Sequence, residues 1–112
     1  MTGPFFQPFI EACPAPDSPF DMQAHIAPGS HLLPMFYEID VEVSIPEHAH
    51  GPQWGVVLEG SMELTIDGQT RTYRRGDTYY VPDGIPHVAV IHAGYKGIDV
   101  FSDPERYLPV TP

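Results

Sequence analysis

Turn-forming residues interrupt this 112-residue chain every several residues, and they constrain its fold more than any other feature. Ten glycines and fourteen prolines separate short runs of aromatic and β-branched residues, and no long segment has helical periodicity. The sharpest signal is Asp67-Gly68, which lies between alternating runs within residues 61–75 and predicts a β-hairpin. Other short strands are predicted at 22–27, 35–45, 53–58, 78–81, 86–92 and 97–102. The pattern predicts one all-β domain, a sandwich or a barrel.

The ends of the chain differ from this pattern. Residues 1–21 form an arm with several prolines and exposed-looking phenylalanines, and we expect it to lack regular structure and to precede a barrel at 22–112. Such an arm either packs on a second copy of the chain or remains loose. Within 35–45, strict alternation predicts one half-buried strand, with Ile39, Val41, Val43 and Ile45 on its apolar face.

Charge and cysteine content narrow the classes of partner. The formal net charge is −10, with only five lysines and arginines. Binding to nucleic acid or to an anionic membrane needs clustered Lys and Arg, so neither partner is expected. Cys13 is alone, which excludes a disulfide within the chain. No stretch approaches the roughly 20 apolar residues of a membrane span, and the first residues do not resemble a signal peptide. We therefore expect a cytoplasmic protein.

Two histidines separated by one residue, His48 and His50, are the first chemical signal. On a strand they point to the same face, with Cα atoms roughly 6.6 Å apart. Two imidazoles at this spacing can bind one metal ion, although two surface histidines would give the same motif. Pro46 can reset the strand register, so the parity of the preceding strand does not decide which face they occupy.

Two segments together resemble the motifs of the cupin family. The segment HAHGPQWGVVLEG at 48–60 resembles the first motif, and GDTYYVPDGIPH at 76–87 resembles the second. They stand in the family's order with a hairpin between them. The resemblance implies a double-stranded β-helix, which is a jelly-roll barrel, with a metal in its mouth. It also implies that His48, His50, Gln53 and His87 are the ligands, although Gln53 follows His50 at a shorter spacing than usual.

The implied ligands are all neutral. A divalent ion held by three imidazoles and an amide oxygen keeps its full charge, which favours binding of an anionic or enediol-like oxygen. Such a set suits Zn, Fe, Ni, Mn or Cu. Metal affinity should fall below roughly pH 6.5, because ligand histidines must be deprotonated. The alternative is a degenerate barrel whose histidines only hydrogen-bond to each other.

The C-terminal segment IDVFSDPERYL resembles the ending of small cupins that linearise unsaturated uronates in pectin and alginate breakdown. The resemblance implies that Asp99 is catalytic and that Phe101 lines the pocket. A catalytic arginine is expected next; Glu105 occupies its place, and Arg106, one residue later, is our candidate for that role. Of the adjacent Tyr79 and Tyr80, one should face the pocket, and Tyr79 is our candidate for substrate binding. We expect His92 to be no ligand and Trp54 to face away from the metal.

Three functions remain in view. The first is a metal-dependent isomerase or lyase for a small sugar acid or a related hydroxylated carbonyl compound, with Asp99 moving a proton. The second is a metal-dependent dioxygenase, and the third is a module that binds or senses a small molecule without turnover. A homodimer is expected, because small cupins resemble dimers and the arm has apolar residues to bury.

Overall fold

The computed structural model describes residues 5–29 and 31–109 and shows two antiparallel sheets facing each other. One short helix, α1 (Pro8–Glu11), precedes the strands. The strands are β1 (Gln23–Ile26), β2 (Leu33–Ile39), β3 (Val43–His48), β4 (Gln53–Glu59), β5 (Ser61–Ile66), β6 (Gln69–Arg74), β7 (Thr78–Val81), β8 (His87–Ile91) and β9 (Tyr95–Phe101).

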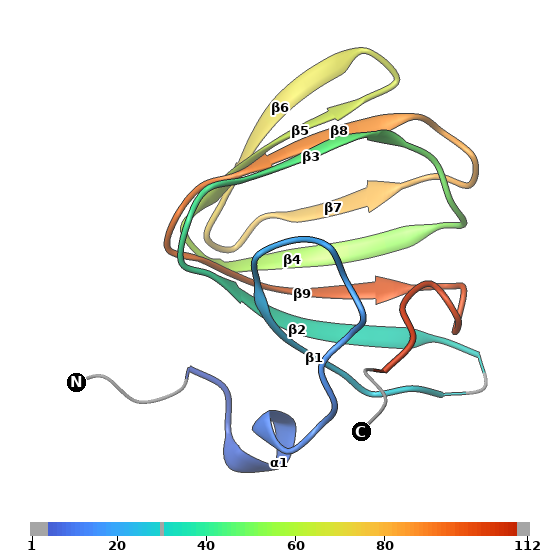
Figure 1. Cartoon of the computed structure of the whole chain (residues 1–112). Coiled ribbons are helices and arrows are strands. Elements are labelled where there is room, and N and C mark those ends of the chain that lie inside the picture. The colour runs from blue at the N-terminus through green and yellow to red at the C-terminus, as the bar shows by residue number, and fades with distance from the viewer. Residues whose placement is uncertain (1–4, 30, 110–112) are drawn as a thin grey trace.

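The two sheets form the expected jelly-roll barrel. The larger sheet has the strand order β1-β2-β9-β4-β7, and the smaller has the order β3-β8-β5-β6. Strands distant in sequence are therefore neighbours, as β2 and β4 are on either side of β9 (Figure 1). The loops β3–β4 and β7–β8 and the end of β9 lie at one end of the barrel, which we call the mouth.

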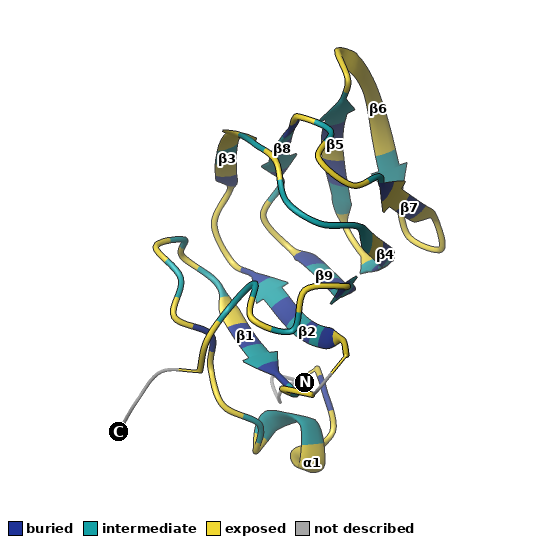
Figure 2. Cartoon of the chain, turned by 90° about the vertical axis from the view of Figure 1, so that its right-hand side faces the viewer, coloured by how far each residue is buried: buried dark blue, intermediate teal, exposed yellow. Residues whose placement is uncertain are grey.

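Alternation along the strands places the core between the sheets. In β2 and β9 every second residue is buried, and these residues pack against the inner face of the opposite sheet. Figure 2 looks in from the mouth and shows buried positions along the strands of both layers. Tyr95, Leu33 and Val57 are almost completely buried. Burial of apolar area on this scale is the main stabilising contribution to such a fold.

The predicted hairpin is present between β5 and β6. Asp67 and Gly68 both have positive φ, 50° and 78°, as a two-residue turn of the primed type requires. Glycine pays no steric cost in this conformation, and aspartate tolerates it better than most residues do.

The prediction of one strand over 35–45 is wrong. The segment is divided into β2, which belongs to the larger sheet, and β3, which belongs to the smaller one. The chain crosses between the sheets at Asp40–Glu42, so Val41 is 51% exposed rather than buried with Ile39 and Val43. Alternation continues across the crossing, which is why sequence periodicity alone does not reveal it.

The N-terminal arm is more ordered than expected, because Pro8–Glu11 forms a single helical turn. Phe6 is buried edge-on against Phe36 of β2, with ring centroids 5.6 Å apart. Further along, the Ile26 amide donates to the Pro14 carbonyl at 2.8 Å, and Pro16 bridges Pro109 of the C-terminal tail. Residues 1–4 of the predicted arm and 110–112 of the tail lie outside the described residues.

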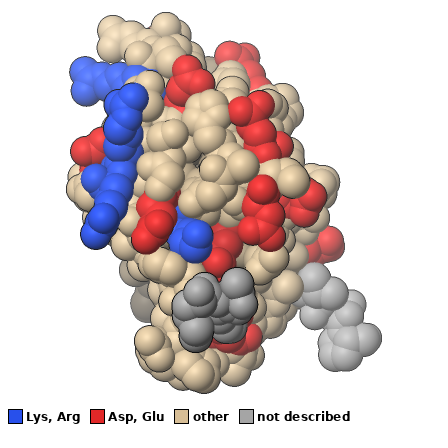
Figure 3. Space-filling view, turned by 90° about the vertical axis from the view of Figure 1, so that its left-hand side faces the viewer, with Lys and Arg blue, Asp and Glu red and all other residues tan. Residues whose placement is uncertain are grey.

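The charged side chains are unevenly distributed. Figure 3 shows the end opposite the mouth, where lysine and arginine side chains gather along one side and carboxylates are spread over the rest. Three of the five basic residues, Arg71, Arg74 and Arg75, come from β6 and the turn after it. Within the described residues, no helix is long and apolar enough to cross a membrane.

Candidate metal centre

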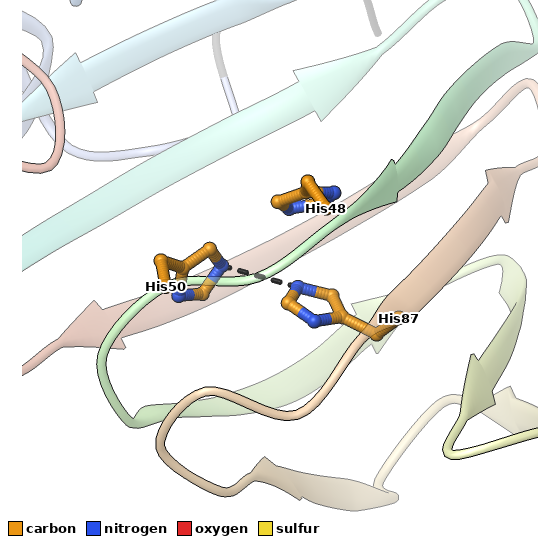
Figure 4. Close-up of side chains that lie close together, drawn as sticks. All are labelled: His48, His50 and His87. Atoms are coloured by element: carbon orange, nitrogen blue, oxygen red, sulfur yellow. Dashed lines mark hydrogen bonds between the residues drawn. The ribbon is translucent and has the colours of Figure 1, made fainter.

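Three histidines converge at the mouth between the two sheets. His48 is the last residue of β3, His50 follows it in the loop, and His87 is the first residue of β8. One ring nitrogen from each lies within 4.8 Å of the others. Figure 4 shows the three rings turned toward one another. The histidines that the sequence predicted are thus brought together from two strands and a loop.

An irregularity at Pro46 turns His48 inward. In β3 the inner positions begin with Val43 and Ile45, so an undisturbed strand would point residue 48 outward. The register shifts between Ile45 and His48, after which His48 pairs directly with His87. Proline cannot donate to a ladder and is found at such bulges. Pro46 therefore does reset the register, and it does so in favour of the site.

Each of the three imidazoles is oriented by a backbone carbonyl. The Nδ1 atom of His48 lies 2.9 Å from the Pro46 oxygen, that of His50 2.7 Å from the Gly51 oxygen, and that of His87 2.9 Å from the Ile85 oxygen. A carbonyl only accepts, so each Nδ1 carries the proton and donates it. In the neutral form of such a ring Nε2 is the unprotonated lone-pair donor, which is the arrangement that metal-ligating histidines adopt.

The spacing of the Nε2 atoms fits a shared cation. Those of His50 and His87 are 3.1 Å apart. Two nitrogens bound to one ion at about 2.1 Å lie about 3.0 Å apart when their angle at the ion is near 90°. Burial lowers the pKa of both histidines, with further lowering from the neighbouring histidines and Arg106, so the rings are neutral near pH 7. Two neutral rings of this tautomer repel at that distance unless a cation or proton lies between them.

Gln53 begins β4 on the opposite sheet and is half-buried. Its side chain lines the same chamber as the three histidines. An amide oxygen there can complete the ligand set, and the role of Gln53 as a ligand stays a prediction.

A buried carboxyl group stands beside the histidines, surrounded by tyrosines. Asp99 of β9 is only 4% exposed, and its Oδ1 accepts a hydrogen bond from the Tyr79 hydroxyl. The Tyr79 hydroxyl lies 3.3 Å from that of Tyr37 and 3.4 Å from that of Tyr95. Burial raises the pKa of Asp99 to about 6, although hydrogen bonds from Tyr79, Tyr37 and Gln53 offset part of the effect.

This tyrosine cluster was missed at the sequence level. Tyr37, Tyr79 and Tyr95 lie on β2, β7 and β9, and nothing in their local patterns indicates that their hydroxyls meet. Burial and the charge of Asp99 raise the pKa of Tyr37 and Tyr79 well above the usual value, so both stay protonated donors. Gly55 makes room for the side chains of Tyr79 and Asp99. A Cβ atom at residue 55 would lie much closer than 3.0 Å to atoms of both.

Arg106 lies at the rim of the chamber and forms no salt bridge with any described residue. Its guanidinium is 4.7 Å from the centre of the Tyr107 ring and 5.9 Å from that of Phe101. Its Nε is buried without a hydrogen-bond partner among the described residues. Phe101 is buried, and its ring meets that of His50 edge-on at 5.7 Å. An arginine one residue out of register with the motif thus still reaches the site.

The remaining predicted positions lie outside the chamber. His92 is bound on the surface between Glu42 at 2.9 Å and Glu63 at 3.1 Å. Tyr80 and Trp54 are exposed on the outer face of the larger sheet, 56% and 44% respectively. Of the adjacent tyrosines it is Tyr79 that lines the chamber.

Comparison with known proteins agrees with this geometry. The Cupin domain family matches residues 35–95, which is more than half of the chain. KdgF from Halomonas sp. is similar, with 28% identity and a TM-score of 0.71 over 90% of this chain and 94% of that one. An RmlC-like cupin from Shewanella frigidimarina NCIMB 400 has 27% identity and a TM-score of 0.76, covering 93% and 94%. A cupin 2 conserved barrel protein from Salinispora arenicola CNS-205, 22% identical with a TM-score of 0.66 and 91% of each chain covered, shows the fold alone. No curated protein matches the sequence.

Proposed function

Because this chain belongs to the cupin family, we propose that it is a metal-dependent isomerase or lyase that acts on a small sugar acid. The observation that carries the proposal is that a buried carboxyl, and an arginine that no described residue pairs with, line the same chamber as the three histidines. A module that only held a metal would need neither, and burying a carboxyl costs stability.

His48, His50 and His87, with Gln53, are the residues that would hold a divalent ion. An ion bound there supplies a Lewis acid that polarises a substrate oxygen. The protein contributes the orientation of the ligands through the Pro46, Gly51 and Ile85 carbonyls, and a chamber whose inner wall is largely apolar.

Asp99 and Arg106 have complementary roles in this proposal. Arg106 pairs with the carboxylate of the substrate, for which a planar guanidinium is well suited. Asp99 holds or moves a proton, and a carboxyl with a pKa of about 6 can both donate and accept near neutral pH. Phe101 packs against His50 and keeps water from that side. The Tyr79 hydroxyl binds Asp99, so its part in substrate binding is through the edge of its ring.

The substrate class rests on two likenesses. The segment around Asp99 and Phe101 resembles the pectin-degradation cupins that linearise unsaturated uronates, and the likeness to KdgF supports the same choice. Arg106 at the chamber rim supports a substrate with a carboxylate.

Loss of ultraviolet absorbance from a 4,5-unsaturated galacturonate or glucuronate tests this function. We expect it with protein loaded with one of Zn²⁺, Mn²⁺, Fe²⁺ or Ni²⁺, and not after treatment with a chelator. An unchanged absorbance with every one of these metals contradicts the proposal. Oxygen uptake would then favour a dioxygenase, and ligand-induced thermal stabilisation without product would favour a binding module.

We also propose that the protein is a homodimer that pairs through the outer face of its larger sheet. Cross-strand partners give this face two apolar rows, one of Tyr80, Trp54, Val100 and Pro34 and the other of Val56 and Ile98, while Phe6 of the arm already covers Phe36 at the end of the second row. The solvent face of an antiparallel sheet is usually polar, and a second copy can cover an apolar one by two-fold symmetry.

In sedimentation velocity we expect a mass about twice 12.4 kDa. Trp54→Glu should shift the protein to the monomer mass, because it places a charge in the middle of the face. Val41→Glu is the matched control, since Val41 is similarly exposed but lies on the crossing between the sheets. A wild-type protein that sediments at 12.4 kDa would exclude the dimer.

A further inference from the structure

A second pocket opens directly outside the chamber and is walled on one side by the N-terminal arm. The chamber itself has a free volume of only about 50 Å³, little more than one or two water molecules occupy. The second pocket, which we call the outer pocket, has about 280 Å³. It shares Ile45, His48, Arg106 and Tyr107 with the chamber. Sites for small molecules usually have 300 Å³ or more, so only the two spaces together are large enough.

The walls of the outer pocket have a distinct chemistry. Most of its surface is apolar or aromatic, from Pro19, Phe20, Ile45, Pro46 and Tyr107. Among the described residues, Arg106 is the only permanent cation that lines it, and Asp17 is the only carboxylate. An anionic group is favoured beside Arg106, whereas a second anionic group near Asp17 is disfavoured. Hydroxyl groups can donate to the Asp17 carboxylate, and the C–H face of a ring can pack on Phe20.

The wall made by the arm is fixed to the barrel. The Asp17 amide donates to the Leu108 carbonyl at 2.7 Å, next to the bridge between Pro16 and Pro109. Phe20 is half-buried and packs against the core, and its amide lies 3.2 Å from the Ser18 hydroxyl. The two end segments of the chain therefore meet at the mouth, where both can contact a ligand.

We propose that residues 17–20 of the arm form a second subsite, which binds the hydroxylated ring of a monocarboxylate whose carboxylate lies at Arg106. This inference rests on the proposed function, which it narrows. The inner chamber takes the carboxylate end of the substrate with the ring bond that reacts beside it, and the outer pocket takes the hydroxylated side of the ring. A substrate with a second anionic group at its far end, such as a phosphorylated sugar acid, is rejected by Asp17.

Two probes separate the subsites in calorimetric titrations of the metal-loaded protein. Acetate is small enough to occupy the chamber alone, at Arg106 or at the metal, whereas D-galacturonate also fills the outer pocket. Phe20→Ala should weaken galacturonate binding at least tenfold and change acetate binding less than twofold. Phe9→Ala is the matched control, because Phe9 lies on the same arm, is 75% exposed and lines no described pocket. It should change neither.

Asp17→Asn is a second variant for the case that Phe20→Ala does not fold. It should fold normally, because Asp17 is exposed and the hydrogen bond of its backbone amide is retained. It should weaken galacturonate binding about threefold or more and leave acetate binding unchanged. Equal effects on both probes, no effect of either variant, or no galacturonate binding by the wild type would each overturn the subsite. Selective effects without conversion of any unsaturated uronate would refute the proposed reaction and keep the subsite.

Discussion

Replacing His87 by alanine is expected to reduce affinity for a divalent metal by more than about 100-fold. Changes to residues that merely orient metal ligands cost about 10–100-fold, and His87 is a ligand in our assignment. It is 3% exposed, pairs directly with His48 across the strands, and places its Nε2 3.1 Å from that of His50. Removing it leaves two histidines, which no longer define a site between the two strands. Competition of Zn²⁺ between the protein and a chromophoric chelator measures the loss.

His92→Ala provides the matched control for this experiment. His92 lies five residues further along, just after β8, and each of its ring nitrogens already faces a surface glutamate. Its removal should leave the metal affinity unchanged. Equal affinities in the wild type and in His87→Ala would mean that the three histidines do not form the site.

The histidines could be predicted from sequence because they belong to two local motifs that resemble those of the cupin family. The hairpin at Asp67-Gly68 was equally clear, because positive φ at two successive residues selects few residue types. The crossing at Asp40–Glu42 had no such signal. There the chain leaves one sheet for the other while its alternation continues, so the pattern was compatible with one long strand.

Strand alternation predicts the direction of a side chain within a strand but not in the turn that follows it. The resemblance placed the arginine at residue 105, so Arg106 stood one residue out of register with the motif. On a strand such a shift would move the side chain to the opposite face. Arg106 follows β9 in a turn, where its amide lies 3.2 Å from the Asp103 carbonyl and strand parity no longer applies. The tyrosines around Asp99 had the correct parity, but their meeting depends on three strands and on the space left by Gly55.

Replacing Asp99 by asparagine is expected to abolish activity while making the metal-free protein more stable above pH 6. In the proposed reaction Asp99 moves a proton, and an amide cannot, so the rate should fall by about 10²–10⁴-fold. Metal binding should be retained, because Asp99 is not one of the assigned ligands. Absorbance assays on an unsaturated uronate and metal competition measurements together separate these two effects.

The gain in stability follows from the direction of the pKa shift. Burial raises the pKa of Asp99 from 3.8 to about 6, so the folded state binds the proton more tightly than the unfolded state does. The stability that Asp99 contributes is therefore complete below pH 3.8 and is lost as the pH rises through 6. Each unit of pKa shift corresponds to about 1.4 kcal/mol, which gives about 3 kcal/mol for the full effect. Asparagine is never charged, and its carbonyl can still accept from Tyr79.

Urea unfolding of the chelated protein at pH 4 and pH 8 tests the shift directly. The free energy of unfolding of Asp99→Asn should exceed that of the wild type by roughly 2.5 kcal/mol more at pH 8 than at pH 4, because at pH 4 a small part of the full effect is already lost. Asp83→Asn, at an exposed aspartate in the turn before β8, should show no such change in the difference. A variant that loses stability at pH 8 would show that the tyrosines stabilise the carboxylate more than burial destabilises it. Asp99 would then be a structural anion rather than a group held ready to exchange a proton.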